Sequence, residues 1–238
     1  FYREAGNPKG ERMMDKLLLV DGNSIMNRAF YGTQDSFMKN SAGLYTGAVY
    51  GFLNILDKFI RAEQPSHIAV AFDLRAPTFR HEKYGGYKAA RKGMPEELAM
   101  QMPVLKDVLD AMKITRLELE TYEADDIIGT YAARAEAAGL ACRILTGDRD
   151  AFQLITDQVH VLLPTTRQGS AAVENYDPAA IREKYGVAPS QMLQMKALMG
   201  DASDNIPGIK GIGEKTAMAL LAQYPSIDEL YAHLDQLD

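Results

Sequence analysis

Short apolar runs recur along the first two thirds of the chain, and most of them end at an aspartate or at turn-forming residues. A run of this length between turn signals is typical of a β-strand that is buried on both faces. The pattern therefore predicts strands over residues 16–22, 67–73, 114–119, 142–148 and 159–163.

Apolar residues at helical spacing fill the intervals between these runs. The pattern predicts a helix over 46–62, with Thr46 as its capping residue, and another over 122–139. A third helix is expected over 95–113, with a kink at Pro103. Strands that alternate with helices indicate an α/β fold, in which a mainly parallel central sheet is flanked by helices.

Two parts of the chain lack this alternation. Segment 74–93 is polar, basic and contains glycine, so we expect a long loop or a mobile helical excursion there. From about residue 178 onward the strand pattern disappears, and helical patterns follow over 177–186, 189–200, 213–224 and 226–236. We therefore expect an N-terminal extension over 1–13, an α/β catalytic domain over 14–177 and a helical subdomain over 178–238.

Composition narrows the class of protein. The chain has 238 residues, of which 47% are hydrophobic, and this supports one sizeable core. Its single cysteine, Cys142, excludes an intramolecular disulfide and a Cys-rich zinc site, and it fits a reducing cytosol. No apolar run approaches the roughly 18 residues of a membrane span, so no membrane partner is expected. The net charge of −6 argues against a nucleic-acid ligand unless the acidic residues are gathered in one place.

Acidic residues fall at positions that an α/β fold brings together. Ligands of such sheets bind beyond the carboxyl ends of the strands, and three predicted strands end at Asp21, Asp73 and Asp148. Further acids begin the helix in YEADDIIG, follow a strand in GDRD, and follow a helix in MGDASD. The complete candidate set is Asp21, Asp73, Glu123, Asp125, Asp126, Asp148, Asp150, Asp201 and Asp204.

Nine carboxylates in one cleft would raise one another's pKa values unless cations compensate their charge. Oxygen ligands without His or Cys favour Mg²⁺, or Mn²⁺ in its place, and so many of them suggest two or more ions. Paired ions roughly 4 Å apart are a recurring device for phosphodiester cleavage. Each acid alone could equally be a helix cap or a turn residue. Their coincidence at one edge favours metal ligation for the set, and setting them aside turns the net charge of −6 into +3.

Two further segments carry features of nucleic-acid binding. In NIPGIKGIGEKTA, glycines and lysines open a helix, a pattern that binds duplex phosphates when it lies between two helices. Its candidate residues are Gly208, Lys210, Gly211, Gly213, Lys215 and Thr216. In the basic and aromatic segment 79–93, the candidates for phosphate contacts and base stacking are Arg80, Lys83, Tyr87, Lys88 and Arg91. The plainer alternatives are a tight turn between helices and a solvated surface loop.

Several motifs occur in the order and spacing of a known family, namely LLLVDGNS, AFD…TFRHE…YKAAR, YEADDIIG, TGDRDAFQL and MGDASDNIPGIKGIGEKTA. Over residues 14–238 the chain resembles the 5′-nuclease (flap endonuclease) family, which includes the N-terminal 5′–3′ exonuclease domains of bacterial DNA polymerases I. It departs from the family's usual residues at Gly47 and Ala90.

The resemblance implies a PIN-like 5′-nuclease fold with a C-terminal helix–hairpin–helix subdomain. It assigns the nine acids to two metal positions, with Asp21, Asp73, Glu123, Asp125 and Asp126 around the first and Asp148, Asp150, Asp201 and Asp204 around the second. It also implies that Lys88 and Arg91 form the active-site basic pair on a helical arch, that Asp126 takes part in catalysis, and that the hairpin binds duplex DNA together with K⁺.

The implied function is a Mg²⁺-dependent 5′–3′ exonuclease or flap endonuclease that acts in DNA replication and repair. Its substrates would be 5′-flapped, branched or nicked DNA duplexes and RNA primers annealed to DNA. We expect a monomer in the bacterial cytoplasm, associated with the nucleoid, and a polymerase domain downstream in a longer chain. Two alternatives stay open: a junction-binding module with weak catalysis, and a metal-dependent ribonuclease of the PIN-like class.

Overall fold

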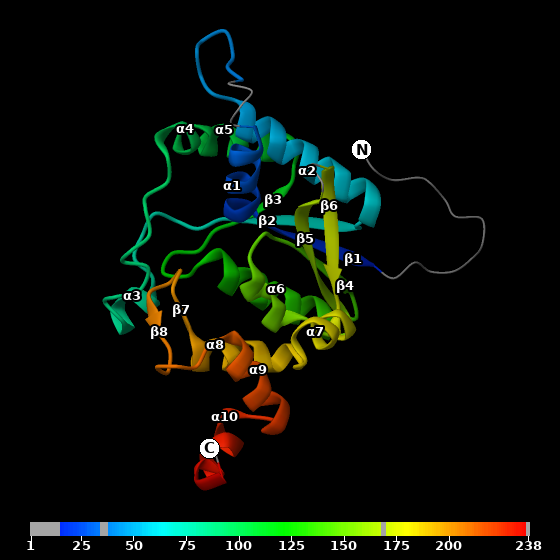
Figure 1. The fold of residues 1–238 in the computed structure, drawn as a ribbon. Helices are drawn as coiled ribbons and strands as arrows, with labels where there is room; N and C mark the ends of the chain where they lie inside the picture. The colour runs from blue at the N-terminus through cyan, green and yellow to red at the C-terminus, as the bar shows by residue number, and fades with distance from the viewer. Residues whose placement is uncertain (1–14, 34–37, 168–169, 237–238) are drawn as a thin grey trace, which may run out of the picture.

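The computed structural model describes residues 15–33, 38–167 and 170–236. The N-terminal extension expected over residues 1–13 lies outside these residues. The fold is built on a six-stranded sheet with the strand order β3-β2-β1-β4-β5-β6 (Figure 1). The strands are β1 (Lys16–Asp21), β2 (His67–Ala71), β3 (Thr115–Leu117), β4 (Ala141–Leu145), β5 (Val159–Arg167) and β6 (Ser170–Tyr176).

Neighbouring strands in this sheet run parallel, except that β6 pairs antiparallel with β5. The five predicted strands are present, and the prediction of a mainly parallel sheet is confirmed. The sixth strand, β6, was not predicted, because its small and polar residues form no apolar run. Two strands end before the aspartates that were expected to close them, since β2 ends at Ala71 and β4 ends at Leu145.

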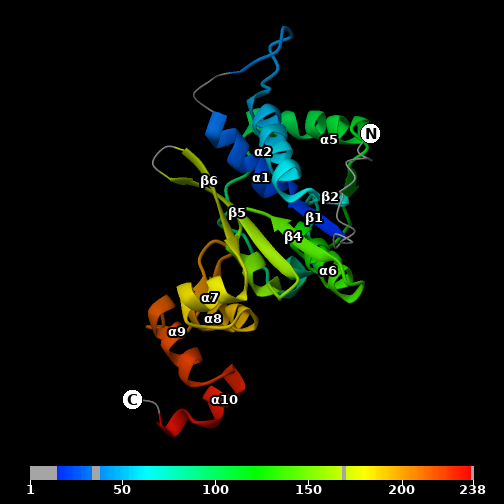
Figure 2. The ribbon, with the colours of Figure 1, turned by 90° about the vertical axis from the view of Figure 1, so that its right-hand side faces the viewer.

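The alternation of side chains along the central strands divides the core into two apolar clusters, one on each face of the sheet. Leu18 and Val20 pack on one face, with α1 (Gly22–Thr33), α2 (Gly47–Glu63) and α5 (Gln101–Ala111). Leu19 and Ile144 pack on the other, with α6 (Ala124–Ala137), α7 (Pro178–Tyr185) and α8 (Met192–Met199). Figure 2 shows these two helical layers on opposite sides of the strands.

The single cysteine lies in the second of these clusters. Cys142 is fully buried in β4, and burial raises the pKa of its thiol to about 12. It is therefore a small apolar core residue and a poor nucleophile.

The predicted helix over 46–62 corresponds to α2, and Thr46 occupies its N-cap position as predicted. The Thr46 side chain makes no capping hydrogen bond. Instead, the buried side chain of Gln101 accepts from the N–H groups of Ala48 (2.9 Å) and Val49 (3.4 Å), so a residue of α5 satisfies the first turn of α2.

The predicted helix over 95–113 is divided into α4 (Glu96–Ala99) and α5, with the break at Met100. This break lies three residues before the predicted kink at Pro103. The proline ring lacks an N–H group and would clash with the carbonyl four residues earlier, at Ala99, and the interruption therefore falls there.

The C-terminal part contains α7, α8, α9 (Glu214–Gln223) and α10 (Ile227–Ala232), as the helical pattern predicted. The expectation that strands are absent beyond residue 178 is wrong. Two short strands, β7 (Gly200–Asp201) and β8 (Ile206–Pro207), pair antiparallel. Because α7 and α8 pack in the same apolar cluster as the sheet, the division at 177/178 stays a prediction. None of the described helices is long and apolar enough to cross a membrane.

Candidate active site

A cleft of about 1070 Å³ opens beside α6, α8 and segment 74–93. It collects predicted site residues from distant parts of the chain, namely Arg80, Lys83, Tyr87, Glu123, Asp125, Asp126, Asp150, Asp201 and Asp204. One further basic residue, Lys196 of α8, lines the same cleft and was not predicted from the sequence.

Asp21 lies at the carboxyl end of β1 and is 6% exposed. One of its carboxylate oxygens accepts from the N–H of Ser24 (2.9 Å), in the first turn of α1, and the other accepts from the hydroxyl of Thr146 (2.8 Å). Burial and the negative charges of Asp73 and Asp148 raise the pKa of Asp21 to about 6, against the lowering effect of these hydrogen bonds. The residue thus caps α1 and also belongs to a cluster of acids.

Asp125 is the second acid whose pKa is strongly raised. It reaches water, but the surrounding protein desolvates it, and the negative charges of Asp21, Asp148 and Asp73 raise its pKa further, to about 8. Among the described residues, no basic side chain forms an ion pair with any of these four acids. We call Asp21, Asp73, Asp125 and Asp148 the open carboxylate group.

Glu123 and Asp126 lie on either side of Asp125 in the sequence. Basic side chains of segment 74–93 compensate their charges. The guanidinium of Arg80 donates two hydrogen bonds of 2.7 Å to Asp126. Lys88 Nζ lies 2.8 Å from one oxygen of Glu123, and the Tyr87 hydroxyl donates to the other at 2.9 Å. Segment 74–93 thus supplies cations to these two acids, although the paired residues are more than thirty positions apart in the sequence.

A second set of acids lies where the 3₁₀ segment Arg149–Leu154 meets the β7 end of α8. Lys196 Nζ forms ion pairs with both Asp150 and Asp201, the latter at 2.7 Å. Burial raises the pKa of Asp201, and hydrogen bonds from Lys196 and Ser203 lower it more strongly, to about 2. Arg91 pairs with the buried Asp204 at 2.5 Å. Cations thus contact all three acids, while burial raises the pKa of Asp150 despite its ion pair with Lys196.

These ion pairs change how the nine acids are grouped. In the part of the chain that the structure describes, no three Asp, Glu, His or Cys side chains are arranged to hold a metal ion as they stand. The open carboxylate group nevertheless fits one divalent cation, because it offers hard oxygen donors that form no ion pair with a described basic side chain. In addition to burial, the charge of Asp148 raises the pKa values of Asp21 and Asp125 and also that of Asp150, whose N–H donates to Asp148 at 2.9 Å. Asp148 therefore lies between the first set of acids and the second set, in which the resemblance placed it. The assignment of each acid to a metal stays a prediction.

Segment 74–93, expected to be a loop or a helical excursion, contains the short helix α3 (Phe79–Lys83). Its later part is hydrogen-bonded to the turn that follows β7. Tyr84 donates to the carbonyl of Asn205 (3.1 Å), Asn205 donates to the carbonyl of Gly86 (2.8 Å), and the Lys88 N–H donates to the carbonyl of Asp204 (2.9 Å). Figure 1 shows α3 beside β7 and β8. The basic segment therefore crosses one side of the cleft.

Burial limits one predicted contact in this segment. The side chain of Tyr87 is 6% exposed, and its hydroxyl is bonded to Glu123. Its ring is therefore not free to stack on a base, and the residue positions Glu123 instead. Tyr84, which was not among the candidates, is 42% exposed and lines the cleft.

The three glycines of the hairpin differ in their structural environments. A Cβ on Gly208 would lie 2.2 Å from the backbone carbon of Met199 and 2.4 Å from the nitrogen of Gly200, so this glycine is required by close packing between β7 and β8. Gly211 adopts a φ of +89°, which favours glycine. Gly213 begins α9 and has open space around it. Close backbone packing thus accounts for Gly208, and its proposed contact with DNA stays a prediction.

The polar candidates of the hairpin are accessible. Lys210, Lys215 and Thr216 are exposed, and no described carboxylate pairs with either lysine. Their contact with DNA, and K⁺ at this hairpin, stay predictions.

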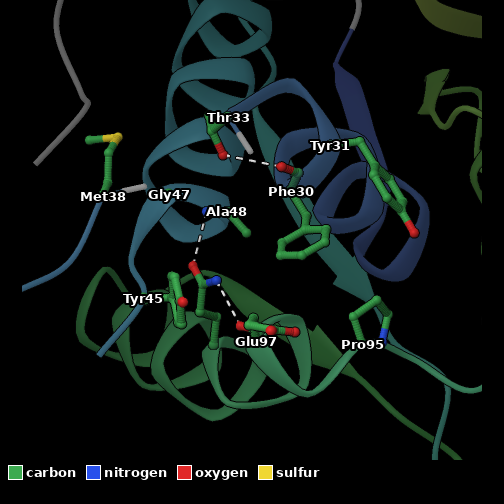
Figure 3. Close-up of a pocket in the computed structure, with 10 residues that line it drawn as sticks. Phe30, Tyr31, Thr33, Met38, Tyr45, Gly47, Ala48, Pro95 and Glu97 are labelled. Atoms are coloured by element: carbon green, nitrogen blue, oxygen red, sulfur yellow. Dashed lines mark hydrogen bonds between the residues drawn. The ribbon is translucent and has the colours of Figure 1, made fainter. Parts of the chain in front are cut away.

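A separate pocket of about 260 Å³ lies between α1, α2 and α4 (Figure 3). None of the predicted site residues lines it. Gly47, at which the chain departs from the family's usual residue, lines this pocket together with Thr33. A Cβ on Gly47 would lie 2.8 Å from the hydroxyl oxygen of Thr33, and this close approach accounts for the glycine.

Comparison with known proteins gives consistent matches along the chain. Residues 16–186 match the family model of the 5′-3′ exonuclease N-terminal resolvase-like domain, and residues 187–238 match that of the 5′-3′ exonuclease C-terminal SAM fold. DNA polymerase I of Bacillus subtilis (strain 168) is 49% identical over 222 residues, which cover 93% of this chain and 25% of that protein. The chain thus spans about a quarter of the length of the curated relatives it matches.

Two solved structures share the fold. A flap endonuclease of bacteriophage T5, in a pseudo-enzyme–product complex with DNA and metal ions, has a TM-score of 0.72 and 23% identity, and the match covers 92% of this chain and 79% of that one. The T5 5′-exonuclease with divalent zinc ions bound has the same TM-score and identity, with 93% and 79% coverage.

Proposed function

Because the chain belongs to the 5′–3′ exonuclease family, we propose that it is a Mg²⁺-dependent nuclease for DNA junctions. It hydrolyses phosphodiester bonds of 5′-flapped, branched or nicked DNA, and of RNA primers annealed to DNA, near the boundary between single strand and duplex. Mn²⁺ substitutes for Mg²⁺, since both prefer oxygen ligands.

The open carboxylate group is the observation that carries this proposal. Burial, together with the negative charge of neighbouring acids, raises the pKa values of Asp21 and Asp125 above those of ordinary aspartates. Asp21, Asp73, Asp125 and Asp148 would hold one divalent ion. Asp150, Asp201 and Asp204 would hold a second after Lys196 and Arg91 give up their ion pairs. Bound ions of this kind lower the pKa of water and stabilise charge on the scissile phosphate.

Residues of segment 74–93 position the substrate strand in this proposal. Arg80 and Lys83 line the cleft, and Lys88 and Arg91 lie against Glu123 and Asp204. Arg80, Lys88 and Arg91 can each exchange a carboxylate partner for a phosphate oxygen, and Lys83 forms no ion pair with a described carboxylate. The exposed Lys210 and Lys215 contact the duplex on the hairpin side, where we also propose a K⁺ ion.

A polymerase domain downstream in the same protein is part of the proposal. Its support is the length of the relatives, because the match covers only 25% of a DNA polymerase I.

The direct experiment is cleavage of a 5′-flap DNA duplex labelled at its 5′ end, with Mg²⁺ and with EDTA. We expect products cut near the junction with Mg²⁺ and none with EDTA. Asp125→Asn should bind the same duplex but cut it far more slowly, because it removes a donor of the open carboxylate group.

Three results would contradict the proposal. Cleavage that persists in EDTA would exclude the metal mechanism, and a folded wild-type chain that binds the flap without cutting it would favour a junction-binding module. Preferential cutting of single-stranded RNA would favour the ribonuclease alternative.

A further inference from the structure

A second groove, of about 620 Å³, adjoins the acidic cleft on the next face of α6. The connection from β3 to α6 forms one wall and α6 itself forms the other. Asp126 and Thr130 line both the groove and the cleft, so the two are continuous across the first turns of α6. We call this the side groove.

The side groove presents exposed aromatic and apolar side chains. Leu119 is 53% exposed, Tyr122 is 46% exposed and Tyr131 is 37% exposed, and all three line it. Scattered exposed apolar residues are ordinary, but several within one concave surface indicate a binding site. Tyr122 also lies against Phe79 of α3, with ring centroids 5.7 Å apart, so the aromatic surface reaches segment 74–93.

The charges in the side groove favour an anionic ligand. Its two acids are already neutralised, Glu118 by Arg116 (2.7 Å) and Lys106 (3.0 Å), and Asp126 by Arg80. Arg134 makes no ion pair with any described residue, and its guanidinium carbon lies 6.0 Å from the ring centroid of Tyr131. The ligand surface therefore combines tyrosine rings with one uncompensated cation.

We propose that the side groove binds the unpaired 5′ strand of a flapped substrate, by stacking bases on Tyr122 and Tyr131 and contacting phosphate through Arg134. Aromatic faces accept any base, and a neighbouring arginine adds phosphate or cation–π contacts, which is the chemistry of sequence-independent single-strand binding. This inference rests on the proposed function, because continuity with the acidic cleft identifies the occupant as the strand that leaves the cutting site.

The test compares binding of flapped duplexes in EDTA, where the proposed cleavage is blocked. The substrates carry a flap of one nucleotide, a flap of several thymidines, or an equally long flap of abasic residues. Wild-type protein should bind the thymidine flap most tightly. Tyr131→Ala should weaken that binding about tenfold and leave binding of the one-nucleotide and abasic flaps unchanged, since neither offers bases to the groove.

Matched variants separate stacking from a general loss of structure. Tyr131→Phe should bind as wild type, because the ring is kept. Tyr231→Ala removes a tyrosine of α10 that is 61% exposed and outside the groove, and it should have no effect. Tyr122→Ala tests the second ring if Tyr131→Ala does not fold.

Equal affinity of the tyrosine variants and wild type for the thymidine flap would overturn the inference, as would equal losses on all three substrates. A failure of the proposed function is distinguishable, because it appears as absent Mg²⁺-dependent cleavage of the one-nucleotide flap by wild-type protein.

Discussion

Arg80 holds Asp126 through two parallel hydrogen bonds of 2.7 Å each, so the guanidinium and the carboxylate lie fork to fork. Paired charge-assisted bonds of this kind are among the strongest polar contacts in proteins. Asp125, the preceding residue, has no such partner among the described side chains and is surrounded by other acids. Two adjacent aspartates in one helical turn are therefore expected to have different roles.

This difference predicts that substitutions of the two aspartates lower the affinity for metal ions to different extents. Asp125→Asn should weaken Mn²⁺ binding about tenfold or more, because it removes a donor from the open carboxylate group. Asp126→Asn should weaken it much less, since Arg80 already occupies that carboxylate. Titration calorimetry with Mn²⁺ measures both. Equal losses would show that Asp126 leaves Arg80 to become a direct ligand, as the family resemblance implies.

The buried Asp21 predicts a pH-dependent stability of the metal-free protein. Its folded pKa of about 6 exceeds the ordinary value of 3.8, so the folded state retains a proton that the unfolded state releases. The free energy of unfolding therefore decreases as pH rises between these two values, and the loss is complete above the folded pKa. Two pH units correspond to about 3 kcal/mol.

Asp21→Asn removes this titration while keeping an acceptor for Ser24. The difference in unfolding free energy between wild type and Asp21→Asn should decrease by about 3 kcal/mol from about pH 4 to about pH 7 in urea titrations with EDTA. Saturating Mg²⁺ should reduce that decrease, because a bound cation compensates the carboxylate. A difference that does not vary with pH would mean that Asp21 ionises as an ordinary aspartate.

The ion pairs of Lys196 predict that this lysine competes with a metal ion for the carboxylates of Asp150 and Asp201. Lys196→Met keeps most of the side-chain volume but leaves Asp150 and Asp201 without their shared partner. The unfolding free energy in EDTA should fall by about 2 kcal/mol. Mg²⁺ should then stabilise the variant more than it stabilises wild type, which thermal unfolding with and without Mg²⁺ would reveal. Equal Mg²⁺ stabilisation of the two proteins would show that no ion uses these acids.

Two glycines of the hairpin form a matched pair for separating packing from DNA contact. Gly208→Ala should destabilise the fold by about 1–3 kcal/mol, because its Cβ would overlap the backbone of Met199 and Gly200. Gly213→Ala has room for its Cβ and should leave stability nearly unchanged. Chemical denaturation measures stability, and anisotropy with nicked duplex measures binding. Weaker DNA binding by the stable Gly213→Ala would identify it as the position where DNA approaches.

The sequence predicted the fold wherever local pattern and tertiary structure agree. The apolar runs of β1, β2 and β4 identify strands buried on both faces, because their alternate residues enter two different cores. The helix α1 was not predicted, although its buried Ile25, Met26 and Ala29 recur at helical spacing. Its first turn is capped by Asp21, which the sequence pattern assigned to the preceding strand.

Local sequence patterns did not predict contacts between residues that are far apart in the chain. Nothing near Thr46 indicates that Gln101, more than fifty residues later, caps α2. The ion pairs of Arg80, Lys88, Arg91 and Lys196 likewise depend on where separate elements meet. The acids themselves were found because they recur at strand and helix ends. Arg80, Lys88 and Arg91 were found as candidates for DNA contacts, but their pairing with these acids was not. Lys196 was missed, although one lysine in the otherwise uncharged helix Met192–Met199 was an available signal.

The position of Cys142 in the middle of the sheet has a practical consequence. A thiol that is fully buried and protonated at neutral pH reacts with alkylating reagents only when β4 separates from its neighbours. A cysteine introduced at an exposed position, such as Tyr231, would therefore take a fluorescent label selectively in the native protein. The native thiol would meanwhile act as an internal reporter of global unfolding in the same sample.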